Sequence, residues 1–226
     1  MKKLPTYAEL KSALIEVVWE KNWGFWLHMW ASIVDRDWVV QNVVFSWDDR
    51  GAQWPGSRVI SAQKANTANA FSLPGLALST ANLFTATQAW QSLFGLQHSN
   101  PVNIHVAYSG DNEKIGTEED PMIGGKIGWV NVFGGGLALY NDEWTLLWAL
   151  WVSGDSSTAD HNIAWKLRHK LGLDFVPAWV NSDGTDNIVY DIVNWVSASG
   201  WWHPETTSEA KEIATNFPKT HPVSKK

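Results

Sequence analysis

The sequence predicts an α+β fold in which helices pack on an antiparallel sheet. Two pairs of segments rich in Val, Ile, Trp and Phe each flank a short polar turn, as the strands of a β-hairpin do. Segments with helical spacing come before, between and after these hairpins. A doubly wound parallel sheet would instead need single strands and helices to alternate along the whole chain.

The first segment of the chain is predicted to form a helix. Thr6 and Glu9 have the spacing of a capping box directly after Pro5, so the chain begins a helix there. Leu10 and Leu14 follow at helical spacing and form one apolar face. This face predicts a helix that packs against the sheet.

The first hairpin and two further helices are predicted next. The β-rich runs 25–34 and 38–47 flank Asp35-Arg36-Asp37, which predicts a turn. A second helix is expected over residues 57–71, with Ser57 as its cap and alanines that favour close packing on a sheet. A third is expected from Ser79 to just before Gly95, and residues 96–128 form a long polar excursion.

The second hairpin is predicted from strands at 137–140 and 145–153. Ser157-x-x-Asp160 then predicts the start of a fourth helix, which stops at Gly172. Residues 174–205 form a loop-rich extension, and the polar end is expected to make at most two helical turns and to fray. We therefore expect a single domain over residues 1–205 and a polar tail over residues 206–226.

The composition excludes several classes of protein. The chain has 226 residues, a formal charge of −6 and no dense basic stripe, which argues against a nucleic-acid partner. It has no cysteine, so a disulfide framework and a thiolate metal site are excluded. No apolar stretch is long enough to span a membrane, and the first ten residues lack the apolar core of a signal peptide. A soluble cytoplasmic protein is predicted.

Tryptophan is unusually frequent, at 17 residues spread along the chain. An indole is bulky, and its N–H needs a partner when it is buried. So many of them indicate a lined cavity, an interface between subunits or deliberate introduction.

The predicted second helix carries cationic candidates. Arg58, Ser61 and Lys64 share one face, and Ser61-x-x-Lys64 matches the nucleophile motif of penicillin-recognising enzymes. That motif lacks its companion motifs here, so nucleophilic catalysis is disfavoured. Arg58 and Lys64 remain candidates to receive a ligand carboxylate or propionate. The glycine cluster over residues 124–136 fits no phosphate-loop template and favours a flexible loop or a close approach of the backbone to a ligand.

The densest polar segment lies where a strand ends and the fourth helix begins. A helix N-terminus favours anions, and helix capping alone explains part of the segment. Capping leaves His161 unexplained, and this histidine is a candidate to bind a metal or heme or to transfer a proton. The candidate ligand-binding residues here are Asp155, Asp160, His161 and Asn162.

Several motifs resemble those of the GlcG/HbpS-like heme-binding family. Residues 57–68 (SRVISAQKANTA) are similar to its "s.iSa.KA.TA" helix. Residues 152–165 (VSGDSSTADHNIAW) resemble its strand-to-helix signature, and residues 133–140 resemble the strand before it. The resemblance spans residues 7–205 and is nearest to long members with a C-terminal extension.

The resemblance implies an α/β sandwich with an antiparallel sheet of about five strands between helices. It also implies a homo-oligomer that handles heme or a related tetrapyrrole, although no single heme ligand holds across the family. The chain departs from the family pattern at Trp47, Trp129, Trp148 and Trp151, where small residues, mostly glycine, are expected. Thr158 stands where cysteine is expected. Tryptophans that line a cavity or interface, or an engineered variant, both account for these departures.

Three functions follow as hypotheses. The first is a binding protein for heme or a similar planar ligand, with His161 as the metal ligand. The second is an enzyme acting on a small organic acid, with His161 as acid or base and Asp155 or Asp160 orienting it. The third is an engineered oligomeric scaffold without retained chemistry.

Overall fold

Four strands form the central antiparallel sheet of the computed structural model, which describes residues 3–225. The strands lie in the order β2-β1-β4-β3. Their bounds are β1 (Trp30–Asp35), β2 (Val40–Phe45), β3 (Gly136–Tyr140) and β4 (Leu146–Ser153). The two predicted hairpins supply β1–β2 and β3–β4, and β1 pairs with β4 between them. The antiparallel sheet flanked by helices is therefore confirmed, with four strands in its main sheet.

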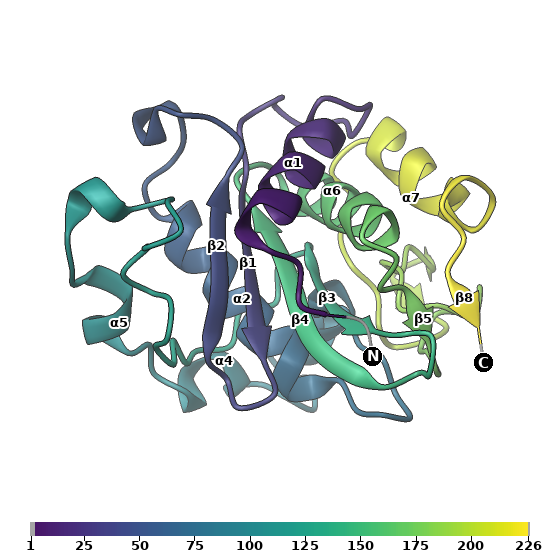
Figure 1. Ribbon diagram of the computed structural model, residues 1–226. Coiled ribbons are helices and arrows are strands. Elements are labelled where there is room, and N and C mark those ends of the chain that lie inside the picture. The colour runs from purple at the N-terminus through teal and green to yellow at the C-terminus, as the bar shows by residue number, and fades with distance from the viewer. Residues whose placement is uncertain (1–2, 226) are drawn as a thin grey trace.

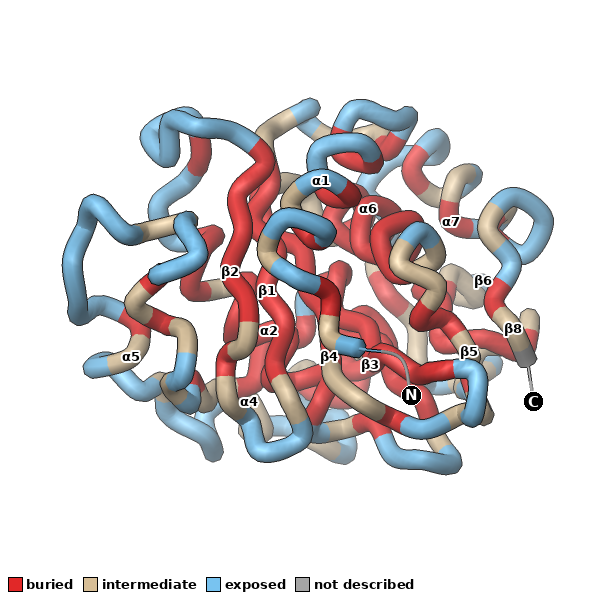
Figure 2. Tube along the Cα trace, in the orientation of Figure 1, coloured by how far each residue is buried: buried red, intermediate tan, exposed pale blue. Residues whose placement is uncertain are grey.

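Helices cover both faces of this sheet (Figure 1). Helix α2 (Ser57–Phe71) packs on one face, across β1, β3 and β4. Helices α1 (Tyr7–Val18) and α6 (Ser157–Lys170) pack on the other face and against each other. Figure 2 shows the strands as an almost continuous buried layer between these helices.

The helix starts differ slightly from the predicted ones. Thr6 and Glu9 form the predicted capping box of α1. Ser57 is the first residue of α2 and not its cap, since Gly56 occupies the cap position and no side chain bonds there. Ser156, rather than Ser157, caps α6 by accepting a hydrogen bond from the amide of Ala159 at 3.3 Å. At α6 the two adjacent serines made the cap position hard to distinguish from sequence alone.

The predicted third helix is largely absent. The segment contains only the 3₁₀ turn η2 (Thr80–Asn82) and the single turn α3 (Leu83–Ala86). It cannot continue through Trp90, whose φ of 67° is incompatible with a right-handed helix. The polar excursion holds three short elements, α4 (Leu96–Ser99), α5 (Ile104–Tyr108) and η3 (Asn112–Lys114), and η1 (Arg50–Ala52) precedes α2.

The expectation of a frayed polar end is wrong. Helix α7 (Ser208–Thr220) follows the cap Thr207 and packs against α6. Its side chains Ala210, Ala214 and Phe217 are fully buried, because they recur at helical spacing on one face. The extension before it contributes the short strands β5 (Phe175–Val176), β6 (Ile192–Val193) and β7 (Val196–Ser197), and β8 (Ser224–Lys225) pairs with β5.

Candidate functional site

A buried ion pair joins the second and sixth helices across the end of the sheet. The ammonium of Lys64 lies 3.0 Å from Oδ2 of Asp160 and donates a second bond to the carbonyl of Gly134 at 3.2 Å. Both charged side chains are almost completely inaccessible, at 2% and 3% exposure. Removing either partner would leave an uncompensated charge buried away from water, which is strongly destabilising. The fold therefore depends on both members of the pair.

Aromatic rings complete the surroundings of Lys64. Its ammonium lies 4.0 Å from the ring centroid of Trp151 and 5.5 Å from that of Phe133. Both distances fall within the range of a cation–π interaction. The lysine is therefore held in its charged form by one carboxylate and two ring faces.

The glycine cluster includes a close approach of backbone to backbone, whereas the predicted approach to a ligand stays a prediction. A Cβ at Gly134 would lie 2.1 Å from the carbonyl oxygen of Ser157, so only glycine fits there. This contact brings the loop before β3 against the N-terminal turn of α6. It also aims the Gly134 carbonyl at Lys64.

Burial shifts the pKa of both members of the pair toward each other. Desolvation raises the pKa of Asp160 to about 7, against the opposing charge of Lys64. Desolvation likewise lowers the pKa of Lys64 to about 8, with Asp160 acting in the other direction. Near neutral pH the protonation of the pair therefore responds to small changes in its surroundings, which is typical of functional sites.

A pocket of about 290 Å³ opens beside this pair. Lys64 and Asp160 form part of its wall. The aromatic side chains of Phe133 (48% exposed) and Trp54 (54% exposed) also line it. The volume is at the lower end of the range of small-molecule sites. The lining residues are Trp54, Ser57, Ile60, Lys64, Phe133, Ser153, Gly154, Asp155, Ser157 and Asp160.

Asp155 lines the pocket, but its carboxylate is already satisfied. It accepts hydrogen bonds from the amide of Phe25 at 2.8 Å and from that of Leu27 at 3.4 Å. Its own amide donates to Oδ1 of Asp160 at 2.9 Å. Asp155 therefore positions Asp160 and fixes the loop before β1.

Arg58 lies away from this pocket. Its Nε donates to Oδ2 of Asp120 at 2.8 Å, and its Nη2 bonds to the other carboxylate oxygen. It lines a different cavity of about 520 Å³ together with Trp30 and Tyr108. The structure thus separates the two predicted cationic residues, Arg58 and Lys64, onto different sides of α2.

His161 and Asn162 are buried on the other side of α6. Both have 0% exposure. His161 Nε2 lies 3.0 Å from Oδ1 of Asn187 and 3.2 Å from the amide nitrogen of Ile188. Asn162 donates to the carbonyls of Asn22 and Ala210. These two predicted residues hold the C-terminal segments in place and do not line the Lys64 pocket.

Sequence reasoning missed a serine–histidine pair at the pocket wall. The Oγ of Ser157 lies 2.9 Å from Nε2 of His203, and it accepts the amide of Gly134 at 2.6 Å. His203 Nδ1 lies 2.7 Å from the carbonyl of Pro204, so Nδ1 carries the proton and Ser157 donates to Nε2. No motif links residues 46 positions apart, and only the fold brings them together.

The fold and this pocket define a layered α+β protein with a buried Lys–Asp pair beside a small ligand-sized cavity. The family model described as "Haem degrading protein HbpS-like" matches residues 26–167. The match covers more than half of the chain, so this protein belongs to the HbpS-like family. No curated protein sequence matches the chain.

Two solved structures are similar to this chain. One is the protein ORFY of Klebsiella pneumoniae, described as DUF336, with 23% identity over 76% of this chain and 94% of that one, at a TM-score of 0.48. The other is a PduOC:heme complex, with 23% identity over 71% of this chain and 88% of that one, at a TM-score of 0.48.

Two further properties bear on the type of site. Within residues 3–225, no group of three or more His, Cys, Asp and Glu side chains is arranged to hold a metal ion. Over the same residues, no helix has the length and apolar character needed to cross a bilayer.

Proposed function

We propose that the protein binds heme or a similar planar ligand that carries a carboxylate, and that the Lys64–Asp160 pocket receives this carboxylate. The family's description supports a role in heme chemistry. The observation that carries the proposal is the buried ammonium of Lys64 in the pocket wall. A charge-assisted hydrogen bond to a carboxylate is roughly twice as strong as a neutral one.

The size of the pocket supports a site for one arm of the ligand. Its volume of about 290 Å³ suits a propionate better than a whole macrocycle. Exposed aromatic side chains stand around it, and Phe25 and Trp54 lie 6.4 Å apart in an edge-on arrangement. These rings provide a surface on which a planar ligand can stack.

The proposal assigns no iron ligand to His161. Its ring is fully buried, and its Nε2 contacts Asn187 and Ile188 rather than the pocket. Iron of a bound heme would supply redox and ligand-binding chemistry, whereas this pocket supplies recognition of the carboxylate. A role for Arg58 in binding a second ligand carboxylate stays a prediction. In the structure Nε and Nη2 of Arg58 are hydrogen-bonded to Asp120.

Heme titration of the purified protein tests the proposal. Saturable binding with a Soret shift and quenching of tryptophan fluorescence is expected for the unchanged chain. Lys64→Met should weaken binding at least tenfold, because it removes a charge-assisted bond worth roughly 1.5–3 kcal/mol. Lys166→Met is the matched control, since Lys166 is also a buried lysine paired with a carboxylate, that of Glu20, but lies outside the pocket. Equal affinities of the two variants would contradict the proposal.

A second candidate function is catalysis on a small organic acid. The observation that favours it is that Asp160, with its pKa raised to about 7, and Ser157 line the same pocket, and that Ser157 is hydrogen-bonded to His203 behind the pocket wall. An acid or base with a pKa near neutrality is well matched to proton transfer. Here Asp160, which lines the pocket, would exchange the proton, and His161, which does not line it, would not. A turnover assay with an inflection near pH 7 that Asp160→Asn removes would support it.

A further inference from the structure

Seven tryptophans have a left-handed backbone. Within residues 3–225, eight residues other than glycine have a positive φ, and seven of them are tryptophan. In this region the Cβ of an L-residue crowds a carbonyl oxygen, and only glycine adopts it routinely. A bulky side chain is a clear outlier there. The seven are Trp23, Trp26, Trp38, Trp90, Trp129, Trp144 and Trp195.

Two of them occupy the same place in two different hairpins. In the β1–β2 turn the amide of Trp38 donates to the carbonyl of Asp35, and in the β3–β4 turn that of Trp144 donates to Asn141. Their φ values are 69° and 55°. A three-residue hairpin of this kind ends in a left-handed residue, and glycine is the residue that suits it.

A third lies in the hairpin of β6 and β7. Asn194 and Trp195 form its two-residue loop, with φ values of 50° and 66°. Two positive φ values define a type I′ turn, for which Asn-Gly is the preferred pair. The chain therefore has the preferred asparagine at the first position of this turn, and tryptophan at the second position, where glycine is preferred.

Two more lie in the loop beside the ligand pocket. Trp23 and Trp26 flank the turn in which Phe25 donates its amide to Asp155, and their φ values are 53° and 61°. Gly24 between them has no room for a Cβ, which would lie 2.1 Å from the Asp155 carboxylate. The backbone of the whole loop is thus folded as a glycine-rich loop around a carboxylate.

At two of the seven positions the side chain gives no reason for tryptophan. Trp90 is 99% exposed and Trp195 is 94% exposed, so neither indole lines a cavity of this chain. The genetic code offers one explanation for tryptophan at all seven glycine-like positions. UGA and UGG differ from the glycine codons GGA and GGG only in the first base. UGA is a stop codon in the standard code, and different organisms reassign it to tryptophan or to glycine.

We propose that these seven positions are encoded by UGA and hold glycine in the protein as its own cell makes it. The loop at residues 23–26 beside the Lys64–Asp160 pocket is then a flexible, glycine-rich loop without indoles. This inference concerns the backbone and holds whether or not the pocket binds heme.

Reading the gene is the first test. We expect UGA at all seven positions and UGG at Trp165, which is buried and stacks on Phe217 at 5.3 Å. UGG at the seven positions would overturn the proposal. Peptide mass spectrometry of the protein isolated from its own cells is the second test. Glycine at these positions is expected, and tryptophan there would overturn the proposal even if the codons are UGA.

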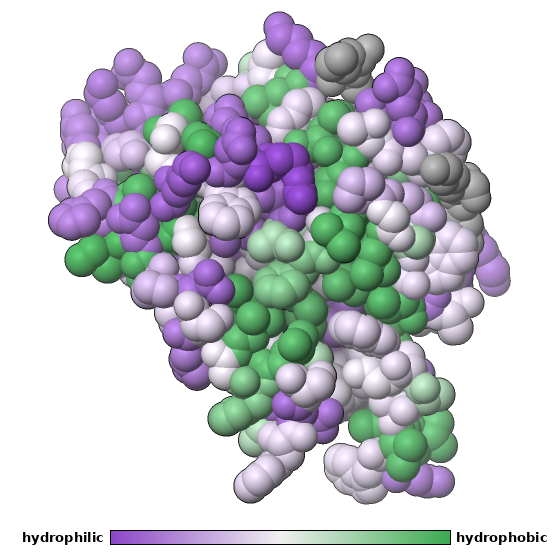
Figure 3. All heavy atoms as spheres, turned by 90° about the horizontal axis from the view of Figure 1, so that it is seen from below, coloured by the Kyte–Doolittle hydropathy of each residue, from purple (hydrophilic) through white to green (hydrophobic). Residues whose placement is uncertain are grey.

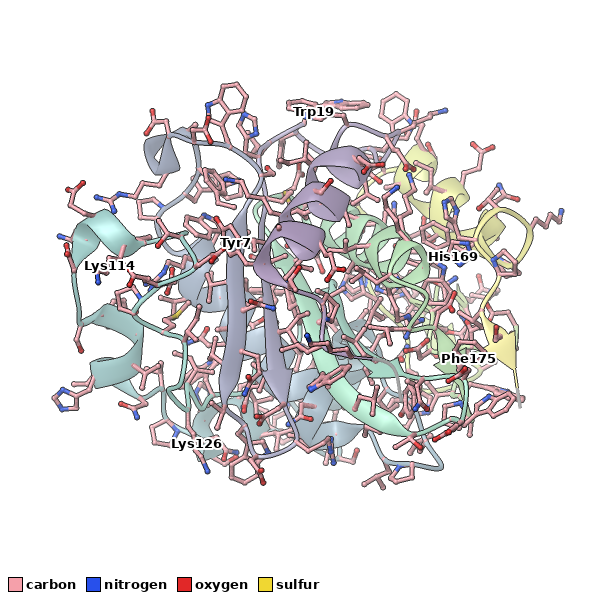
Figure 4. All side chains as sticks on the ribbon, viewed as in Figure 1. Tyr7, Trp19, Lys114, Lys126, His169 and Phe175 are labelled. Carbon is pink, nitrogen blue, oxygen red and sulfur yellow. The ribbon has the colours of Figure 1, made fainter. Side chains whose placement is uncertain are left out.

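A matched pair of recombinant variants tests the physical argument independently. Trp38 and Trp19 are both 54% exposed, but Trp38 has a φ of 69° and Trp19 has a φ of −87°. Figure 4 shows Trp19 at the rim of the molecule beyond the end of α1. Trp38→Gly should raise the melting temperature by about 2 °C, because it relieves the left-handed strain. Trp19→Gly should leave it unchanged or lower it. A Trp38→Gly variant no more stable than Trp19→Gly would overturn the argument.

Discussion

At the residue scale, the Lys64–Asp160 pair predicts that the proposed ligand binding depends on pH. Asp160 has its pKa raised to about 7 by burial. Below that pH it holds a proton, and the pair then carries the net positive charge of Lys64. Above it the pair is neutral and attracts a ligand carboxylate less strongly.

We therefore expect heme affinity to fall as the pH rises through about 7, by up to about tenfold per pH unit. Titrations at constant ionic strength on both sides of neutrality measure this slope. Asp160→Asn should lose the part of this dependence that Asp160 causes. Lys64 then titrates alone, with its pKa lowered further because the carboxylate that raised it is gone. An unchanged slope in Asp160→Asn would assign the pH dependence to another group.

Trp151 is the second residue that decides the properties of the site. It is fully buried on the α2 face of the sheet, opposite Ser32 and Gly136 in the strand register. The ring is so close that a Cβ at Gly136 would lie 2.3 Å from it. Its Nε1 has no hydrogen-bond partner among residues 3–225. A large ring thus occupies a position in the sheet whose neighbours on the adjacent strands are small residues.

Trp151→Gly should open an indole-sized cavity next to Lys64. A large-to-small change of this kind costs roughly 3–5 kcal/mol, which corresponds to a fall in melting temperature of about 10 °C. Added indole should recover part of that loss by filling the cavity, as small apolar molecules do. Thermal unfolding with and without indole measures both effects. Trp47→Gly, at a position 50% exposed, should show no recovery.

At the scale of elements, α7 is the main departure from the sequence-based expectation. The segment is polar overall, but its apolar residues recur on one face. Phe217 stacks on Trp165 of α6 at a centroid distance of 5.3 Å and an interplanar angle of 7°. Asn162 and Asn187 also bond to carbonyls of α7, at Ala210 and Ala214. The helix is therefore a part of the fold.

Phe217→Ala should lower the free energy of unfolding by roughly 3–5 kcal/mol, because the ring is fully buried. Urea unfolding followed by fluorescence measures the change. Thr215→Ala on the exposed side of the same helix is the control, expected within about 0.5 kcal/mol of the unchanged protein. Equal effects of the two substitutions would mean that α7 does not contribute its packing in solution.

At the scale of the whole molecule, two buried histidines are expected to make the folded protein less stable in acid. Desolvation lowers the pKa of His161 and that of His203 to about 4. The unfolded chain binds protons at these groups near pH 6.5, so it gains protons first as the pH falls. Their contribution is complete above about pH 6.5 and is lost as the pH falls through 4. Asp160 acts in the opposite direction, because its pKa is raised.

A single variant isolates the histidine contribution. His203→Gln should reduce the loss of stability between about pH 6.5 and pH 4 by about 3 kcal/mol. Unfolding free energies measured across this range, for the variant and the unchanged chain, give the difference. His105→Gln, at an exposed position, should leave the pH profile as it is. A parallel profile for His203→Gln would place the acid sensitivity elsewhere.

The surface is relevant to assembly. The face in Figure 3 carries hydrophobic residues gathered between hydrophilic ones. Exposed large side chains of the described residues include Phe25, Phe94 and Ile104, at 67%, 68% and 59% exposure. A homo-oligomer and a cytoplasmic location stay predictions, and light scattering of the purified protein measures the first.

Much of this molecule followed from local sequence. The capping box at Thr6 and Glu9, the polar turns of both hairpins and the alanine-rich face of α2 each act within a few residues, so they predicted their elements. The motifs at residues 57–68 and 152–165 identified the family. These signals depend on residues close together in the sequence, so they do not require any knowledge of the tertiary contacts.

Only the tertiary structure decided which residues meet. Lys64 pairs with Asp160 across 96 positions, Arg58 with Asp120 across 62, and Ser157 with His203 across 46. Those partners depend on how helices stack on the sheet and on backbone contacts such as that of Gly134 with Ser157. The strained φ of the tryptophans is likewise a property of the folded backbone. Long-range packing determines both the partners and these φ values. A sequence pattern predicts which face of a helix or strand is apolar, but it does not predict which residues pack against that face.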